Sequence, residues 1–347
     1  MRLVDKIAVV IGAGQSPGEG MGNGRATVLR FAQEGAKVLA VDRDLASAEE
    51  TAGLVAKAGG TCVAFEADVT REATLSAAMA AAQARWGRLD ILHYNVGVSI
   101  AGGDAPIFEI SEEAFDRLCA INLRGAVMAC KHALPIMRAQ RAGVIIAISS
   151  AAAWEQYPNV AYKATKAAMV ALTQQIAIQN AAYGIRANVI LPGLMDTPMA
   201  VDTRVRVSGK SRAEIAAQRD ARVPLRGRMG TAWDVANAAL FLYRGRPAGR
   251  RRGTGSRRRL SERRQGRWPA GSAADALSLS YESPARFSTN VKRSARLHPW
   301  APLGGSRVWV AALGAATAPQ CGSATAAAVS GLRPGSTTTW VPTVTRR

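Results

Sequence analysis

Short apolar runs alternate with stretches of helical periodicity along the first 243 residues. The run from Ile7 to Ile11 is apolar throughout and is followed by glycine, which is typical of a strand buried on both faces. Similar runs predict strands at 37–41, 62–65, 89–94, 144–148 and 186–190, and apolar spacings of three and four predict helices at 25–33, 46–58, 74–86, 112–137, 162–183 and 233–242. This alternation predicts an α/β fold with a doubly wound parallel sheet and helices on both faces.

The rhythm stops after Tyr243, and the composition changes at the same point. From Arg244 onward lie 19 of the 45 Lys and Arg residues but only three of the 25 Asp and Glu residues. The total formal charge of +20 therefore divides into about +4 for residues 1–243 and about +16 for residues 244–347. We predict one folded domain, 1–243, and an irregular basic tail, 244–347, which is expected to be disordered because it offers little apolar surface to bury.

Composition bears on three further properties: metal binding, membrane insertion and cellular location. The cysteines lack metal-ligand spacing, so we expect free thiols in a reducing compartment and no metal site; they are Cys62, Cys119, Cys130 and Cys321. No apolar stretch approaches about 18 residues, so we expect no membrane span. The first apolar run is too short for a signal sequence, which favours a cytoplasmic location.

A glycine-rich segment joins the first predicted strand to the first predicted helix. Gly12 follows the strand, and Gly22 and Gly24 precede the helix. Glycines let the backbone approach a pyrophosphate, and a helix N-terminus offers free N–H groups and a positive dipole end. In this position the segment predicts a Rossmann-like dinucleotide site.

The end of the second predicted strand bears on the choice of cofactor. A carboxylate at Asp42 is placed to accept hydrogen bonds from the ribose hydroxyls of NAD, and it would repel a 2′-phosphate. Arg43, next to it, is able to pair with such a phosphate. We favour NAD and keep NADP as the alternative.

Tyr162 and Lys166 are four residues apart in a predicted helix and therefore share a face. A tyrosine with a pKa near 10 is a poor base at neutral pH, and lowering that pKa to about 7 takes roughly 4 kcal/mol. An ammonium about 4 Å away at an effective dielectric of about 20 supplies energy of that size. The pair therefore predicts an acid–base centre. The alternative is that the two residues merely lie on an exposed helical face, and the surrounding motifs disfavour it.

Those motifs resemble the short-chain dehydrogenase/reductase family over about residues 3 to 243. In the family's order they are Gly12 with Gly22-Asn23-Gly24, Asp68-Val69, Asn95-Val96-Gly97, Asn122, Ser149-Ser150, Tyr162 with Lys166, and Pro192-Gly193 with Thr197-Pro198.

The resemblance implies catalytic roles. Tyr162 would be the general acid/base, and Lys166 would lower its pKa and bind the nicotinamide ribose. A serine would hydrogen-bond the substrate oxygen: family position points to Ser150, and a spacing of 13 to the tyrosine keeps Ser149 as the alternative. Asn122 would hold a water of the proton relay, the alternative being that it only satisfies backbone groups in its own helix.

Further residues would line the cofactor site on the same grounds. The resemblance implies that Asp68 and Val69 contact adenine and that Asn95 and Gly97 border the cofactor. The Pro192-Gly193 pair belongs to the same site. Thr197 would reach the nicotinamide carboxamide or the phosphates, the alternative being a turn residue.

The sequence departs from the family pattern in three ways. From Gly12 to Gly22 the loop is six positions longer than the compact family motif. Ile11 and Tyr94 replace a threonine and an asparagine that the family often has. After the helix at 233–242 we find no final edge strand with an apolar–Asp–Gly–Gly ending, and the abrupt arginine-rich start at Arg244 suggests the hypothesis of a changed reading frame.

These observations favour an NAD-dependent oxidoreductase that transfers a hydride between cofactor and a secondary alcohol or ketone. Substrate contacts are expected from residues 99–108, 151–159 and 195–223. The first alternative is an inactive dinucleotide-binding protein that lacks the last strand; the second is a nucleic-acid binder through the tail, disfavoured because aromatic residues are not interleaved with the basic ones. The family resemblance also implies a homo-oligomer, a tetramer or dimer.

Overall fold

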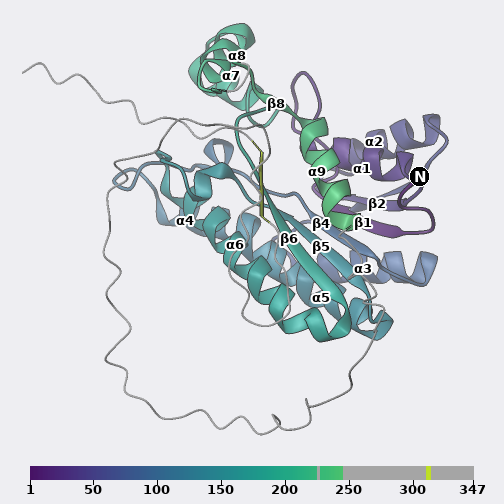
Figure 1. The fold of residues 1–347 in the computed structure, drawn as a ribbon. Coiled ribbons are helices and arrows are strands. Elements are labelled where there is room, and N and C mark those ends of the chain that lie inside the picture. Colours follow the sequence, from purple (N-terminus) through teal and green to yellow (C-terminus); the bar gives the residue numbers. More distant parts are fainter. Residues whose placement is uncertain (225–226, 245–309, 314–347) are drawn as a thin grey trace, which may run out of the picture. The chain divides into compact units, whose positions relative to one another are not determined.

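A parallel β-sheet forms the centre of the protein (Figure 1). The computed structural model describes residues 1–224, 227–244 and 310–313. Neighbouring strands follow the order β3-β2-β1-β4-β5-β6-β9. Their bounds are β1 Ile7–Ile11, β2 Lys37–Asp42, β3 Thr61–Glu66, β4 Ile91–Tyr94, β5 Gly143–Ile148, β6 Ile185–Pro192 and β9 Val310–Leu313. The order reverses beside β1, and such a switch point opens a crevice at the carboxyl ends of the strands.

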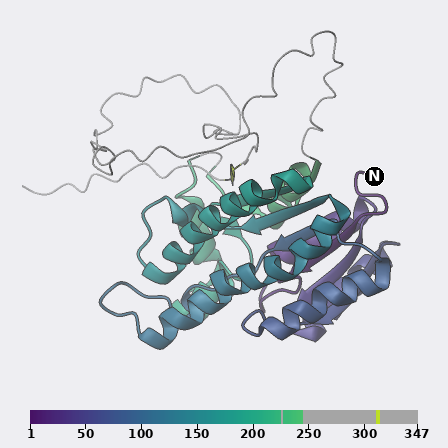
Figure 2. The ribbon, with the colours of Figure 1, turned by 90° about the horizontal axis from the view of Figure 1, so that it is seen from below.

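Helices cover both faces of the sheet, as the sequence predicts. One face carries α1 (Asn23–Gln33), α2 (Leu45–Lys57) and α9 (Ala232–Arg244), and the other carries α3 (Glu72–Trp86), α5 (Gly125–Gln140) and α6 (Val160–Asn180). The last three lie side by side in Figure 2, where α5 contacts both α3 and α6.

Alternation of side chains along the strands produces these two cores. In β1, Val9 and Ile11 enter the core under α3, α5 and α6, whereas Ala8 and Val10 enter the core under α1 and α9. Successive side chains of a strand point to opposite faces, so a strand covered on both faces needs apolar residues at every position. The continuous apolar run that predicted β1 therefore has a direct structural cause.

The helix predicted over 112–137 is interrupted. It consists of α4 (Glu112–Cys119), a π-helical turn (Ala120–Arg124) and α5. A π turn inserts one extra residue into the helical ladder and is often found at functional sites. The apolar periodicity continues through the turn, so the sequence pattern did not reveal it.

Between β6 and α9 the chain forms a small separate layer beyond the carboxyl end of β6, and we call residues 194–231 the lid segment. It contains β7 (Met195–Asp196), α7 (Asp202–Ser208), α8 (Arg212–Asp220) and β8 (Gly230–Thr231), and β7 pairs with β8. The sequence predicted substrate contacts here but none of these elements. Both helices are short, which leaves little periodicity to detect.

The expectation that no edge strand follows α9 is corrected by β9. Val310–Leu313 pairs in parallel with Val189–Pro192 of β6 and occupies the edge of the sheet. The run is only four residues long, and 65 residues separate it from the end of α9, so no spacing connected it with β6. The tail predicted as disordered otherwise lies outside the described residues, as does Cys321. Within the described residues, no helix is long and apolar enough to cross a membrane.

Candidate active site

The loop after β1 lies against the start of α1 more closely than any side chain would allow. A Cβ on Gly24 would lie 1.8 Å from the carbonyl oxygen of Gly12, and Gly12 itself has a φ of +80°. Asn95 lies just after β4, and its side-chain amide donates to the same Gly12 carbonyl at 3.1 Å. These contacts explain two of the predicted glycines and bring Asn95 to the loop.

The N-terminus of α1 is suited to bind a pyrophosphate. Its N-cap is Gly22, which provides no side-chain cap, and no acidic residue occupies the first turn. The first-turn N–H groups therefore keep their hydrogen-bonding capacity, and the helix dipole favours an anion there. Gln15 of the inserted loop accepts from the Gly22 amide at 3.0 Å and fixes the approach to the helix.

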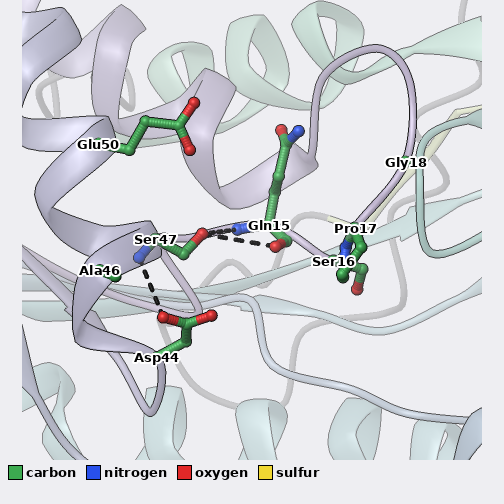
Figure 3. A pocket seen from close by; sticks show the side chains of 8 residues that line it. All are labelled: Gln15, Ser16, Pro17, Gly18, Asp44, Ala46, Ser47 and Glu50. Atoms are coloured by element: carbon green, nitrogen blue, oxygen red, sulfur yellow. Dashed lines mark hydrogen bonds between the residues drawn. The ribbon is translucent and has the colours of Figure 1, made fainter.

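Asp42 ends β2 beside this loop. Its carboxylate accepts hydrogen bonds from the backbone amides of Gly14 at 2.9 Å and Asp44 at 3.2 Å. Next to it opens a pocket of about 450 Å³ whose lining includes the carboxylates of Asp44 and Glu50 (Figure 3). The buried Arg25 nearby is already paired with Glu50 at 2.6 Å. The pocket is therefore acidic, a poor environment for an additional phosphate.

Tyr162 and Lys166 lie in the first two turns of α6, as predicted, and the two serines after β5 have different partners. The Ser150 hydroxyl accepts from the amide of Ala152 at 3.2 Å, and its hydrogen bonding lowers the pKa of Tyr162. Ser149 is buried and its hydroxyl donates to the backbone carbonyl of Lys166 at 2.6 Å. The Ser149 hydroxyl therefore donates its proton to the backbone, whereas the Ser150 hydroxyl acts on the phenol of Tyr162.

Lys166 is buried beneath Tyr162, with its Nζ 5.7 Å from the centroid of the tyrosine ring. The ammonium donates to the carbonyls of Ile148 at 2.8 Å and Val96 at 3.2 Å. A Cβ on Gly97 would lie 2.7 Å from this Nζ, so a glycine is needed for the lysine to reach the loop after β4. Burial lowers the pKa of Lys166 to about 8.

The electrostatics of Tyr162 differ from the expectation that Lys166 lowers its pKa. Burial is the largest influence and raises the pKa of Tyr162 to about 12, although part of the residue remains exposed. The opposing effects come from the hydrogen bond with Ser150 and the positive charge of Arg204. Lys166 is not among the groups that shift the pKa of Tyr162, and its ammonium donates to two carbonyl groups.

Asn122 lies in the π turn and is fully buried. Its side chain accepts from the amide of Val98 at 2.8 Å and donates to the carbonyl of Val98 at 2.9 Å and to Thr165 at 3.2 Å. These bonds fasten the loop after β4 to helix α6 one turn from Tyr162. The side chain therefore holds the backbone of the loop at Val98, outside its own helix.

The remaining predicted residues line the same edge of the sheet or the turns that follow it. Asp68 accepts from the amide and hydroxyl of Thr70 and so shapes its own turn. Val69 is buried, Pro192 ends β6 with Gly193 directly after it, and buried Thr197 accepts from the amide of Ala200 at 3.4 Å at the start of the lid segment.

Comparison with known proteins decides the family. Residues 18–248 match a family model described as enoyl-(acyl carrier protein) reductase. The chain belongs to the short-chain dehydrogenase/reductase family. The match begins inside the glycine loop, after Gly12, and it covers Ser150, Tyr162 and Lys166.

Several members of this family are similar to the chain over most of their own length. The 2-(R)-hydroxypropyl-CoM dehydrogenase of Xanthobacter autotrophicus is 35% identical over 241 residues, 69% of this chain and 91% of that protein. The cis-4-hydroxycyclohexanecarboxylate dehydrogenase of Sinomonas cyclohexanicum is 37% identical over 240 residues, 69% and 89%. The crystal structure of a putative short-chain dehydrogenase/reductase from Burkholderia xenovorans is 41% identical, covers 70% of this chain and 90% of that one, and has a TM-score of 0.62.

Compared with the compact family motif, the inserted loop of this short-chain dehydrogenase/reductase is tied to the lid segment. Arg206 of α7 donates to the carbonyl of Pro17 at 3.0 Å, and Asp202 accepts from the amide of Glu19 at 3.4 Å. Arg212 lies between the carboxylates of Glu19 and Asp202, at 3.7 and 3.5 Å. The loop on the cofactor side thus contacts the layer expected to cover the substrate.

A buried network that no sequence motif predicts lies at the N-terminus of α6. One carboxylate oxygen of Asp104 accepts from the amides of Ala161 and Tyr162, at 3.0 and 3.3 Å, in the first turn of α6. The other accepts from the Ser99 hydroxyl at 3.0 Å, and Ser99 is 2.8 Å from the hydroxyl of Tyr157. Because these residues are distant in sequence and form no motif, only their segments, 99–108 and 151–159, were predicted.

Proposed function

We propose that this protein is an NAD(H)-dependent dehydrogenase that interconverts a secondary alcohol and its ketone, with Tyr162 as general acid/base. The observation that carries the proposal is the arrangement of Tyr162, Ser150 and Lys166 at the carboxyl edge of the sheet, beside a loop and helix N-terminus suited to a pyrophosphate. The relatives named for alcohol oxidation agree with this chemistry.

Different residues would bind the parts of the cofactor and the substrate. The first turn of α1 would hold the pyrophosphate, Asp42 the adenosine ribose and Lys166 the nicotinamide ribose; Asp68, Val69, Asn95, Gly97, Pro192, Gly193 and Thr197 would border the cofactor. When bound, the nicotinamide exchanges a hydride with the substrate carbon and in its oxidised form adds a positive charge near the phenol. Ser150 would hold the substrate oxygen.

Proton transfer falls to Tyr162. In alcohol oxidation its phenolate takes the hydroxyl proton, and in ketone reduction its phenol returns that proton to the oxygen. Positioned proton transfer is typically worth about 10²- to 10⁴-fold in rate. Asn122 would act indirectly, by fixing the loop at Val98 against α6.

The acidic surroundings of the adenosine site favour NAD over NADP. The carboxylates of Asp42, Asp44 and Glu50 would repel a 2′-phosphate, and Arg25 is committed to Glu50. Arg43 is exposed and remains the group that argues for NADP.

Substitution of the catalytic tyrosine tests the proposal. We expect Tyr162→Phe to abolish turnover of secondary alcohols while NADH still binds, because the phenylalanine keeps the ring but has no proton to exchange. Ser149→Ala serves as the matched control and should retain more activity than Ser150→Ala. Turnover by Tyr162→Phe at the rate of the unmodified enzyme would remove Tyr162 from the mechanism, and tight NADH binding without turnover by the unmodified protein would favour an inactive binding protein.

A further inference from the structure

The lid segment contains positive charge that its own acidic residues do not neutralise. The lid segment has four carboxylates, and each has a partner other than Arg204 or Arg219. Asp196 and Asp202 face Arg212, Glu214 caps α8 through Ser211, and Asp220 accepts from the amide of Met229.

Arg219 of α8 is buried without a counter-ion. It is only 7% exposed, its Nε contacts the sulfur of Met229 at 3.1 Å and its Nη2 reaches the carbonyl of Met195 at 3.4 Å. Among the described residues, no carboxylate lies within 4 Å of it. A buried guanidinium is costly unless it is paired, so the lack of an acidic partner requires an explanation.

A second guanidinium, Arg204 of α7, acts electrostatically on the first and on the phenol of Tyr162. It is half-buried and donates to the carbonyl of Ala200 at 2.6 Å, again with no carboxylate within 4 Å in the described part of the chain. Burial, followed by the charge of Arg204, lowers the pKa of Arg219 to about 10, and the same charge lowers the pKa of Tyr162. The two cations therefore act on each other and on the reaction centre.

Two other arginines of the lid segment have partners on the cofactor side. Arg206 donates to Pro17 of the inserted loop, and Arg212 is surrounded by three carboxylates. These two arginines belong to the cofactor side of the crevice. Arg219 is influenced by the charges of Arg204 and Arg222 and, more weakly, by Tyr157 and Asp196, and Tyr162 is influenced by the charge of Arg204.

We propose that Arg204 and Arg219 form an anion-binding subsite of the substrate cavity, so that the alcohol or ketone carries a carboxylate or a comparable oxyanion. This inference rests on the proposed dehydrogenase function and narrows its substrate class. A guanidinium offers several donors in a planar fork that matches a carboxylate, and a buried one gains most from such a partner. The anionic group would supply the missing counter-ion and orient the hydroxyl-bearing carbon toward Tyr162.

Matched pairs of substrates test the subsite on the full-length protein with NAD. The probes are 3-hydroxybutyrate and 4-hydroxycyclohexanecarboxylate, each beside its neutral primary amide. We expect Arg204→Gln to lower kcat/KM for the carboxylates by about 10- to 100-fold, the size of a lost charge-assisted hydrogen bond, and to change the amides by less than about threefold. Lys210→Gln removes the same charge from an exposed site of the lid segment and should change neither.

Other outcomes would overturn the inference. Equal losses for carboxylates and amides would make Arg204 merely structural, and a rise confined to the KM for NAD would assign it to the cofactor phosphates. Arg219→Lys, which keeps the charge, should retain folding and the preference for carboxylates if Arg219→Gln does not fold.

A binding measurement separates failure of this inference from failure of the proposed function. Cyclohexanecarboxylate and cyclohexanecarboxamide are titrated calorimetrically into the NADH-loaded protein, which requires no turnover. Tighter binding of the carboxylate that is lost in Arg204→Gln supports the subsite even if no alcohol in the panel is oxidised. Equal binding of both compounds overturns the subsite, whereas oxidation of neutral alcohols alone leaves the dehydrogenase function standing.

Discussion

At the scale of single residues, Tyr162, the proposed acid/base, is influenced by groups that no motif contains. Asp104 caps the first turn of α6 from 57 residues away, because the N-cap Asn159 provides no side-chain cap and instead donates to the carbonyl of Asp104 at 3.1 Å. A carboxylate accepts hydrogen bonds only, so Ser99 must donate to Asp104 and Tyr157 must donate to Ser99. Tyr157 therefore presents lone pairs, and we infer that it accepts hydrogen bonds from any donor beside it.

The charge of Asp104 gives a signed prediction for the pH dependence. That charge raises the pKa of Tyr162, so Asp104→Asn should lower the pKa and shift the rising limb of alcohol oxidation to lower pH. Ser150→Ala should shift the same limb to higher pH, because the bond that lowers the pKa is lost. Profiles of kcat against pH measure both. A purely structural role for Asp104 would change kcat at all pH values and leave the limb in place.

Removal of the cap also has a cost in stability. Asp104→Ala leaves two amides of α6 without their acceptor and should lower the free energy of unfolding by about 1 to 3 kcal/mol. Asp104→Asn keeps an acceptor oxygen and should lose less. Thermal unfolding of the two variants separates the cap from the charge.

At the scale of elements, sequence patterns predicted what is long and periodic. Both cores follow from the alternation along strands such as β1, and the face shared by Tyr162 and Lys166 follows from helical spacing. The π turn at Asn122 and the short helices α7 and α8 were missed, because one extra residue or two helical turns leave no distinct period. The choice between Ser149 and Ser150 required coordinates, since adjacent residues differ only in direction.

We expect the inserted loop and α7 to be displaced together, and substitutions of two glycines in the loop test this. A Cβ on Gly18 would lie 2.4 Å from the carboxyl carbon of Asp202, whereas a Cβ on Gly20 would meet nothing closer than 3.8 Å. Both residues have positive φ, so alanine strains the backbone at either position. We expect Gly18→Ala to raise the KM for NAD and for substrate together by about three- to 30-fold through displacement of α7, and Gly20→Ala to have a much smaller effect. Equal effects of the two variants would mean that backbone strain, not the contact with α7, is responsible.

At the scale of the whole molecule, the sheet ends on a strand contributed from far along the chain. Val310–Leu313 pairs with the last four residues of β6, and the lid segment begins two residues after β6 ends. An unpaired β6 would leave hydrogen-bonding groups at the sheet edge directly beneath the substrate layer. The basic tail thus matters to the enzyme through this strand, whatever the origin of its unusual composition.

Ending the chain after Arg244 tests this dependence. Loss of the β6–β9 ladder should lower the free energy of unfolding by about 2 to 4 kcal/mol, which at this size is a fall in Tm of about 4 to 12 °C. Because β6 leads into the lid segment, the KM for substrate should rise more than the KM for NAD. The double substitution Ala311→Pro and Ala312→Pro in the full chain is the control, since it removes two backbone donors while keeping the charge and length of the tail. If the truncated chain loses stability and the proline variant does not, residues other than β9 are responsible; if neither changes, the strand contributes nothing to the fold and β6 is sufficient as an edge.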